Sequence, residues 1–251
     1  MGQHGKHRAL VIFLGRLWLA VAALAAGPDA AAAQDCRLAL LLAMDVSSSV
    51  DAREDRLQRG GMAAALVAPE VREAFFASGP AVALAIYEWS GRFNHRLLLD
   101  WTLIDSDAAL DRASRVIAES RRADTEFPTA LGNALGYGAG LLRKAPDCLA
   151  KTLDMAGDGQ NNDGFPPALA YAQFPFDGIT VNGLVIKQGD PRAGAALADF
   201  YRREVLHGEA AFLEEADGFE DYERAMRRKL ERELSAPVVG RSTLPAQERR
   251  G

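Results

Sequence analysis

Five oxygen-bearing side chains are spaced in this sequence so that together they could hold a metal ion. Asp45, Ser47 and Ser49 alternate directly after an apolar run, and alternate residues of an extended turn point the same way. Thr129 stands at the start of a predicted helix, and Asp158 follows a predicted strand. All five offer oxygen and two are carboxylates. This set suits a hard cation, Mg²⁺ or alternatively Mn²⁺ or Ca²⁺, and not zinc or copper.

Each of these residues also has an ordinary structural explanation. Ser47, Ser49 and Thr129 could be helix caps, while the two aspartates could be loop carboxylates. The ordinary explanation is the better one for any single residue, whereas a metal site is the better one for all five together. Further polar residues close to the same loops could shape the rim of the site, but solvated loop residues are the better interpretation: Asp51, Asn161, Asn162 and Asp163.

An alternation of strands and helices would position these side chains. Residues 38–44 are uniformly apolar and stop at a polar turn, which predicts a central parallel strand buried on both faces. A short linker with a glycine joins residues 82–89 to residues 96–101, so the second of these strands is expected to run antiparallel at a sheet edge. Further strands are expected over residues 150–156, 179–186 and 211–214.

Helical spacing of apolar residues predicts the layers that cover the sheet. Helices are expected over residues 51–77, with a break near Pro69, and over 107–120, 129–142, 168–172, 194–205 and 219–234. The helix over 129–142 contains four glycines, which suggests that it lies very close to the sheet. A basic run near the end of the last helix is expected to be a solvated face: Arg227, Arg228, Lys229 and Arg232.

The predicted fold class is α/β, with a doubly wound, mostly parallel six-stranded sheet in the order 3-2-1-4-5-6. Strand 3 is expected to be antiparallel, and helices are expected on both faces. In such a sheet, binding sites lie at the carboxyl ends of the strands, near the point where the strand order reverses. Asp45 would follow strand 1 and Asp158 strand 4, which are neighbours in this order. The polar clusters are therefore expected to meet at one edge.

These residues resemble the metal-ion-dependent adhesion site of von Willebrand factor A domains. The shared features are Asp-x-Ser-x-Ser after a first apolar strand, a later Thr at a helix start, and Asp158-Gly159 after the fourth strand. Residues 38–234 also resemble, more closely, an uncharacterised bacterial family of exported von Willebrand factor A-like proteins. That family is known only as a domain of unknown function. The resemblance covers nearly all of the chain after residue 33.

The resemblance implies a role for each residue of the site. Ser47, Ser49 and Thr129 would bind the metal directly, while Asp45 and Asp158 would act largely through water. A carboxylate from a partner protein would fill the open coordination position, because a site of neutral hydroxyls leaves the cation attractive to negative charge. One departure is that residue 157 is glycine where many members carry threonine. It leaves the ligand set intact and affects only the fine geometry of the Asp158 loop.

The expected function is that of a non-enzymatic, metal-dependent protein-binding domain of the adhesion type. Its partner would be an unknown protein that presents an acidic residue. One alternative is a metal-assisted hydrolase of the cell envelope, and the other is a structural domain whose loops a cation braces. The sequence disfavours the enzyme because it lacks a nucleophile elbow, a phosphate-binding loop and a dinucleotide-binding fingerprint.

The ends of the chain indicate export. Basic residues precede a long apolar run, and a series of small alanines ends at Ala33, so residues 1–33 are expected to be a signal peptide. An uncleaved anchor is the alternative. Residues 34–236 would form the domain and residues 237–251 a flexible tail. The protein is expected to be periplasmic or secreted, without stable membrane insertion after cleavage, and its net charge of −5 gives no electrostatic reason to bind nucleic acid.

The two cysteines, Cys36 and Cys148, are expected to form a disulfide. An even pair in an oxidising compartment is more often bridged than free. Counting back from the two site aspartates places both cysteines near the amino ends of adjacent parallel strands, at a separation that a disulfide can span. Two unrelated buried thiols are the alternative.

Overall fold

The computed structural model describes residues 1–2, 36–77, 79–122 and 126–235. Within these ranges six strands form one sheet in the order β3-β2-β1-β4-β5-β6, and only β2 and β3 pair antiparallel. The strands are β1 (Cys36–Asp45), β2 (Val82–Trp89), β3 (His95–Ile104), β4 (Cys148–Gly157), β5 (Ile179–Lys187) and β6 (Leu213–Asp217). The predicted fold class, strand order and antiparallel third strand are confirmed.

Strand β1 lies between β2 and β4 in the sheet, and all of its residues are buried. It pairs in parallel with β2 on one side and β4 on the other, where Met44 stands opposite Ala156. Alternation of side chains sends Leu40 into one apolar core and Leu41 into the other. The carboxyl ends of β1 and β4 therefore meet at the same edge of the sheet.

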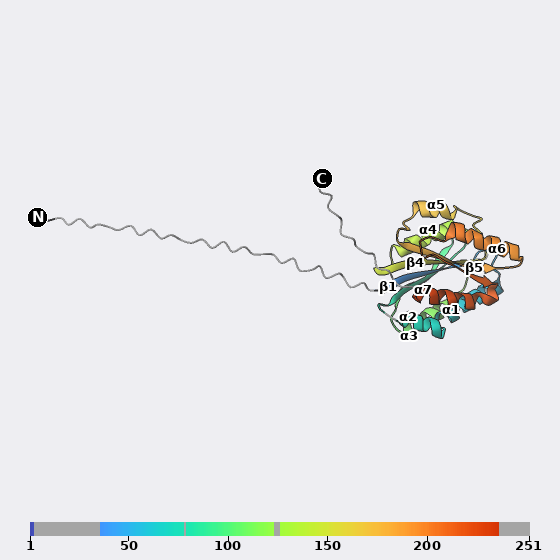
Figure 1. Ribbon diagram of the computed structural model, residues 1–251, viewed down its shortest axis with the longest axis horizontal. Helices are drawn as coiled ribbons and strands as arrows, with labels where there is room; N and C mark the ends of the chain where they lie inside the picture. The colour runs from blue at the N-terminus through green and yellow to red at the C-terminus, as the bar shows by residue number, and fades with distance from the viewer. Residues whose placement is uncertain (3–35, 78, 123–125, 236–251) are drawn as a thin grey trace. The chain divides into compact units, whose positions relative to one another are not determined.

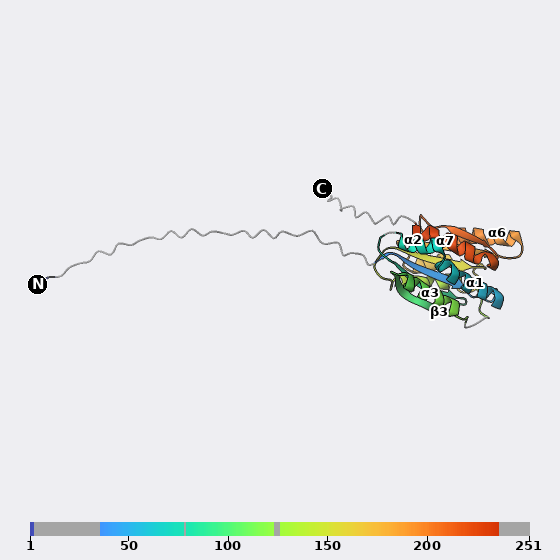
Figure 2. The same ribbon diagram turned by 90° about the horizontal axis from the view of Figure 1, so that it is seen from below.

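Helices cover both faces of the sheet, as Figure 1 shows. One layer contains α1 (Ala52–Leu66), α2 (Pro69–Phe76), α3 (Asp107–Glu119) and α7 (Tyr222–Ser235). The opposite layer contains α4 (Leu131–Leu142), α5 (Pro167–Gln173) and α6 (Pro191–Phe200). Figure 2 shows α3 beside β3, the strand at one edge of the sheet. Each layer encloses its own apolar core, so the sheet is buried between them.

Several helices begin where the sequence offers a cap or a proline. Asp51 caps α1 by accepting from two backbone N–H groups, and Glu54 completes the capping box. Ser106 caps α3 by accepting from the backbone N–H of Ala109. Pro69 stands in the first turn of α2, where its missing N–H costs nothing, so the helical segment predicted over 51–77 is divided into two helices.

Several element boundaries differ from the sequence prediction, among them those of β3, α4 and α6. Strand β3 runs to Ile104 and not only to residue 101, because its pairing with β2 continues as far as Val82. Helix α4 begins at Leu131, so Thr129 lies in the loop before the helix and not in its first turn. Helix α6 ends at Phe200 and is followed by a π-helical segment, Tyr201–Val205. Hydrogen bonds to neighbouring elements decide these ends, and apolar periodicity does not report them.

One of the four glycines of α4 lets the helix approach the sheet closely. A Cβ atom on Gly138 would lie 2.9 Å from Cδ2 of Leu153 on β4. Gly132 and Gly136 instead adjoin the segments that follow β4, and Gly140 borders open space. The predicted close approach of α4 is therefore confirmed at Gly138, while the other glycines serve contacts elsewhere.

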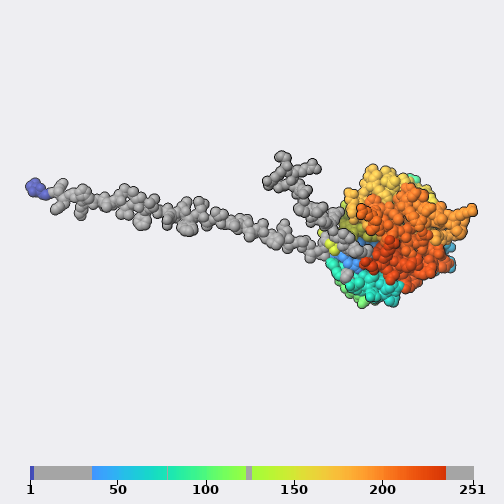
Figure 3. Space-filling view, viewed as in Figure 1, coloured from blue at the N-terminus to red at the C-terminus, as the bar shows by residue number. Residues whose placement is uncertain are grey.

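Helix α7 lies along the sheet, and its outer side contributes to the surface seen in Figure 3. Its predicted apolar stripe is buried: Tyr222, Met226, Leu230 and Leu234. The expectation of a solvated basic face is wrong for Lys229, which is 0% exposed. Its ammonium group forms ion pairs with Asp154 on β4 and Glu233 on α7. The buried carboxylates beneath the helix need this positive charge. The sequence of α7 does not reveal Asp154, because that residue lies on β4.

Cys36 and Cys148 form a disulfide, as predicted. They are register partners at the first residues of β1 and β4, with Cα atoms 4.6 Å apart. The bridge therefore joins the amino ends of the two central strands. It lies at the opposite end of β1 from Asp45.

Two predictions about the ends of the chain fall outside the described part. The predicted signal peptide, residues 1–33, is described only at Met1 and Gly2, and the predicted tail, residues 237–251, is not described. No helix in the described ranges is long and apolar enough to cross a membrane.

Candidate metal centre

Asp45 closes β1, and its own oxygens shape the loop that follows. Its Oδ1 atom accepts a hydrogen bond from the backbone N–H of Ser47 at 2.8 Å. The side-chain amide of Gln58 on α1 donates to the Asp45 carbonyl oxygen, also at 2.8 Å. Asp45 and Ser47 are both 0% exposed. The turn is thus held from within and from the neighbouring helix.

The five predicted residues come together in one hydrogen-bonded cluster. The Thr129 hydroxyl lies 3.2 Å from Ser47 Oγ, which lies 3.1 Å from Ser49 Oγ. Ser49 Oγ in turn donates to Oδ1 of Asp158 at 2.8 Å. The loops after β1, before α4 and after β4 each contribute to the cluster. The order of the strands brings the loops after β1 and β4 together, because β1 and β4 are neighbours in the sheet.

One carboxylate oxygen of the cluster has no hydrogen-bond partner among the described residues. This atom is Oδ2 of Asp45, which is buried. Burial, followed by the nearby charge of Asp158, raises the pKa of Asp45 to about 8. Burial also raises the pKa of Asp158. A buried acceptor without a donor is costly, so a positive charge would be favourable beside it.

The donor set fits a hard divalent cation held largely by neutral oxygens. The cluster supplies three hydroxyls and two carboxylates, all of them oxygen ligands. A group of three or more His, Cys, Asp or Glu side chains that could hold a metal occurs nowhere among the described residues. The hydroxyl-rich cluster is therefore the candidate that the described part offers.

Arg122 binds the loop after β1 from outside. Its guanidinium group donates to the carbonyl oxygens of Ser47, at 3.1 Å, and of Val50. Its positive charge also lowers the pKa of Asp45 and Asp158, which opposes the effect of their burial. The sequence does not point to this residue, because the contact with Ser47 spans 75 positions along the chain.

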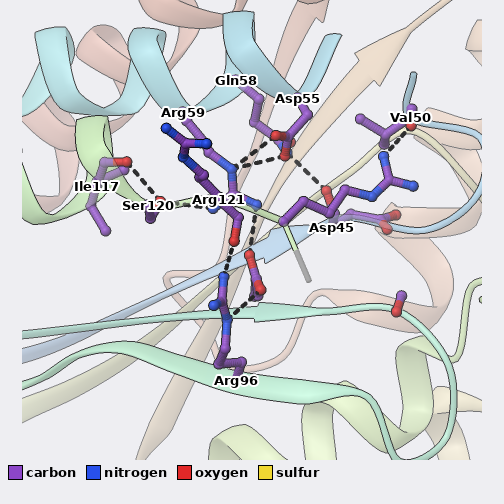
Figure 4. A network of polar contacts seen from close by, with 12 residues as sticks. Asp45, Val50, Asp55, Gln58, Arg59, Arg96, Ile117, Ser120 and Arg121 are labelled. Carbon is purple, nitrogen blue, oxygen red and sulfur yellow. Dashed lines mark hydrogen bonds and ion pairs between the residues drawn. The ribbon is translucent and has the colours of Figure 1, made fainter. Parts of the chain in front are cut away.

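A polar network, drawn in Figure 4, fixes the segment that leads to this arginine. Glu88 on β2 pairs with Arg59 at 2.6 Å and with Arg96 at 2.7 Å. Arg59 also donates to the Ser120 hydroxyl at 2.8 Å, and Arg96 donates to the carbonyl oxygen of Arg121. Arg59 and Glu88 are almost fully buried, so their charges must be paired. The network therefore anchors the segment after α3 to the sheet edge.

Two asparagines after β4 position the loop that carries Thr129. The Asn162 side-chain oxygen accepts from the backbone N–H of Thr129 at 2.8 Å, and Asn161 accepts from Gly132 at 3.1 Å. Helix α4 has no side-chain cap of its own, since its N-cap residue is Ala130. The asparagines supply acceptors for backbone donors that would otherwise lack them. The sequence signal is their position three and four residues after Asp158, although the sequence predicts only solvated loop residues there.

The other polar residues near the site make equally specific contacts. Asp51 caps α1, as described above, and Asp163 accepts from Arg92 Nε at 2.7 Å. Gln188, just after β5, donates its side-chain amide to Oδ2 of Asp158 at 3.1 Å. Both oxygens of Asp158 are therefore hydrogen-bonded. This difference from Asp45 leaves Asp45 Oδ2 as the cluster's unsatisfied acceptor.

Solved structures share this fold at low sequence identity. Proximal thread matrix protein 1 from the mussel byssus, in a structure with a zinc-occupied MIDAS motif, is 13% identical with a TM-score of 0.56, covering 78% of this chain and 48% of that chain. A von Willebrand factor type A structure from Catenulispora acidiphila is 15% identical with a TM-score of 0.55, covering 79% and 43%. The pilus adhesin SpaC from Lactobacillus rhamnosus GG is 12% identical with a TM-score of 0.57, covering 80% and 31%.

This chain spans less than half the length of each of these three proteins. The likeness shows the fold, which is that of a von Willebrand factor A-like domain. No curated protein matches the chain by sequence. The family model described as "Protein of unknown function (DUF1194)" matches residues 35–238, which is most of the chain. The predicted resemblance to an uncharacterised family is confirmed, and the chain belongs to the DUF1194 family.

Proposed function

We propose that this protein is a metal-dependent protein-binding domain of the adhesion type. Ser47, Ser49 and Thr129 would hold a divalent cation directly, with Asp45 and Asp158 as outer carboxylates. The bound cation would supply an electrophilic position for a carboxylate of the partner. The observation that carries the proposal is the convergence of these oxygens from three loops around a buried acceptor that lacks a donor.

The chemistry of the cluster supports capture of an anionic group. Neutral hydroxyls neutralise none of a cation's charge, so a cation held by them keeps its attraction for an incoming carboxylate. Both carboxylates of the cluster already accept hydrogen bonds from the protein. Asp45 accepts from the backbone N–H of Ser47, and Asp158 accepts from Ser49 and Gln188. These bonds hold the loops in place around the position that a partner would approach.

The comparisons support the same proposal at the level of the fold. One protein of this fold has a structure with a zinc-occupied MIDAS motif, and another is described as a pilus adhesin. We propose Mg²⁺ as the cation of this chain, with Mn²⁺ or Ca²⁺ as alternatives, because oxygen ligands favour hard cations. Zinc belongs in the test because the mussel protein binds it.

Thermal unfolding with and without metal tests the site. A cation that binds only the folded state raises the melting temperature by mass action. We expect such a rise in the wild type with millimolar Mg²⁺. Asp45→Asn should abolish the rise and yet melt higher than the wild type without metal, because it replaces a buried carboxyl group whose ionised form is disfavoured and whose Oδ2 atom has no donor. Ser47→Ala should weaken the response.

Asp51→Asn is the matched control, because asparagine caps a helix as well as aspartate does. It should keep the full metal response. A wild-type melting curve that no cation moves would contradict the metal site. An Asp45→Asn variant that responds as strongly as the wild type would contradict the proposed role of Asp45.

The same preparation separates the alternative functions. Metal-dependent retention of acidic peptides is expected for a binding domain. Hydrolysis of generic phosphate esters would instead indicate a metal-assisted hydrolase. A melting temperature that rises with metal, without capture of any acidic group, would indicate a cation that only braces the loops.

We also propose that the protein acts outside the cytoplasm. The disulfide supports this proposal, because such bonds persist in oxidising compartments. The composition of residues 1–33 supports it as well. Cell fractionation with amino-terminal sequencing of the purified protein tests it. We expect a chain that begins near Gln34 in the periplasm or medium, whereas an intact chain in the cytoplasm would contradict export.

A further inference from the structure

An aromatic pocket, here the Phe93–Phe127 pocket, borders the candidate metal centre. It has a volume of about 280 Å³. Its lining residues are Gly91, Arg92, Phe93, Asn94, Phe127 and Asp163. Phe93 is 95% exposed in the turn between β2 and β3, and Phe127 is 42% exposed. Apolar side chains left in water beside a polar site forgo the stabilisation of burial, which is typical of a contact surface.

The turn that carries Phe93 is held in a fixed position. Ser90 N donates to Asn94 O at 3.1 Å, and Asn94 N donates to Gly91 O at 3.2 Å. Gly91 approaches Phe127 so closely that a Cβ atom on it would lie 3.1 Å from Phe127 Cβ. The backbone of the turn and its contact with Phe127 are therefore in place before any partner arrives, which lowers the entropic cost of binding there.

Backbone hydrogen bonds connect this pocket to the loops of the metal centre. Phe127 O accepts from the N–H of Ser48, the residue between the two serines of the cluster, at 2.8 Å. Asp163 N donates to the carbonyl oxygen of Thr129 at 3.1 Å. An extended peptide advances about 3.3 to 3.6 Å per residue. A side chain within one or two residues of a carboxylate at the metal centre would therefore reach the pocket.

The pocket suits an uncharged occupant of modest size. Its charged lining residues are Arg92 and Asp163, which form an ion pair with each other. Its volume lies just below the range of about 300 to 1,000 Å³ for small-molecule sites, so it suits one large side chain. The phenylalanines favour an apolar one.

We propose that the Phe93–Phe127 pocket binds a large apolar side chain that stands within two residues of the partner's acidic residue. The recognised segment would thus combine Asp or Glu with Leu, Ile, Met or Phe. This inference rests on the proposed function, because the partner carboxylate must first occupy the metal centre. The cation would require a carboxylate in the partner segment, and the pocket would select those acidic segments that also carry a large apolar side chain.

Short labelled peptides with one central Asp in a Gly-Ser background provide the test. One set carries Leu at each of the two positions on either side of the Asp, the reference carries Ser there, and a third peptide replaces the Asp with Asn. Binding is measured by fluorescence anisotropy with Mg²⁺ and with chelator, using protein concentrations up to the millimolar range. We expect the Asp reference to bind only with Mg²⁺, and at least one Leu peptide to bind about tenfold more tightly.

Phe93→Ser should remove this tenfold preference and leave binding of the Ser reference unchanged. The side chain is exposed, so the variant should keep its melting temperature and its response to Mg²⁺. Phe76→Ser is the matched control, because Phe76 is also an exposed phenylalanine. It ends α2 and precedes the amino end of β2, whereas the pocket follows the carboxyl end of β2. It should keep the preference for the Leu peptide.

The outcomes distinguish the two proposals. If no Asp peptide binds with Mg²⁺, the proposed function fails and this inference falls with it. If Asp peptides bind but Leu gives no advantage, or if the advantage survives in Phe93→Ser, the inference is overturned while the proposed function stands. If Phe93→Ser instead abolishes self-association of the protein, the pocket faces a second copy of the chain, which also overturns the inference.

Discussion

At the scale of single residues, Asp45 packs so closely against Gly157 that no side chain fits at position 157. A Cβ atom on Gly157 would lie 2.5 Å from the Tyr201 hydroxyl and 2.9 Å from Oδ2 of Asp45. This explains why residue 157 is glycine where the resemblance leads one to expect threonine. The Tyr201 hydroxyl is buried beside the site, and burial raises its pKa well above the ordinary value. Tyr201 thus occupies the volume that a threonine side chain would need.

Gly157→Ala should therefore damage both stability and metal binding. We expect a loss of about 1 to 3 kcal/mol in the free energy of unfolding, which is typical of overpacking, and a smaller melting shift with Mg²⁺ because Asp45 is displaced. Chemical denaturation with and without metal measures both. Adding Tyr201→Phe should restore part of the stability, because it removes the nearest clashing atom.

Gly140→Ala is the control for this substitution. Nothing lies within 4 Å of the Cβ that it would add, and it stands inside α4. It should stabilise the protein by up to about 1 kcal/mol through helix propensity alone. Equal stability of Gly157→Ala and the wild type would show that the site has more room than these distances indicate.

At the scale of elements, helix α7 is held to the sheet by a buried polar cluster as well as by its apolar stripe. Lys229 pairs with Asp154 and Glu233, and the side-chain amide of Asn182 on β5 donates to Glu233 at 2.6 Å. The Lys229 ammonium also lies 4.5 Å from the centre of the Phe212 ring. Two carboxylates thus share one ammonium group. Burial, followed by the charge of Glu233, raises the pKa of Asp154 to about 8.

The contribution of this buried polar cluster to the free energy of unfolding should fall as pH rises. Asp154 titrates near 3.8 when unfolded and near 8 when folded, so the folded state binds more protons between these values. Its contribution to stability is therefore fully present below about pH 4 and is lost as pH rises towards 8. Asp154→Asn should flatten this part of the curve. Urea midpoints from pH 5 to pH 8, measured without metal, test the difference between the two proteins.

Asp177→Asn provides the comparison, because Asp177 is an exposed aspartate in the turn before β5. Its curve should follow that of the wild type. If the stability of Asp154→Asn depends on pH as steeply as that of the wild type, then Asp154 is ionised throughout this range and its pKa is not raised.

At the scale of the whole molecule, the disulfide and the candidate metal centre lie at opposite ends of the central strands. Cys36 and Cys148 join the amino ends of β1 and β4, while Asp45 and Asp158 follow or close the same strands at their carboxyl ends. The bridged residues are 112 positions apart in the sequence. The bridge therefore constrains the unfolded chain over a long loop without contacting the site.

Cys36→Ser combined with Cys148→Ser should lower stability and leave the site intact. The chain-entropy model gives a loss of on the order of 4 to 5 kcal/mol for so long a loop, and measured losses are often smaller. Urea unfolding of oxidised, reduced and double-serine protein measures it. The melting shift with Mg²⁺ should match that of the wild type. Loss of that shift in a protein that is still folded would show coupling between the two edges of the sheet.

The sequence by itself was sufficient for the frame of the molecule and for the residues of the candidate site. Apolar runs and helical spacing report which face of a segment avoids water, so they predicted six strands and the buried stripe of α7. The strand order was predicted from the doubly wound α/β class that the alternation of strands and helices implies. Because β1 and β4 are neighbours, the same order predicted that Asp45 and Asp158 meet and that Cys36 faces Cys148. The assignment of a metal to these residues stays a prediction.

Only the tertiary structure decided which distant groups face one another. Arg122 reaches the loop of Ser47 across 75 positions, and Asn162 reaches Thr129 across 33. Lys229 carries a charge that its helix pattern assigns to solvent, but a carboxylate on β4 lies beneath it. The exposed Phe93 borders the site because its turn packs against Phe127. Periodicity records contact with water or core, and it carries no information about which atom of another element completes a polar contact or a pocket.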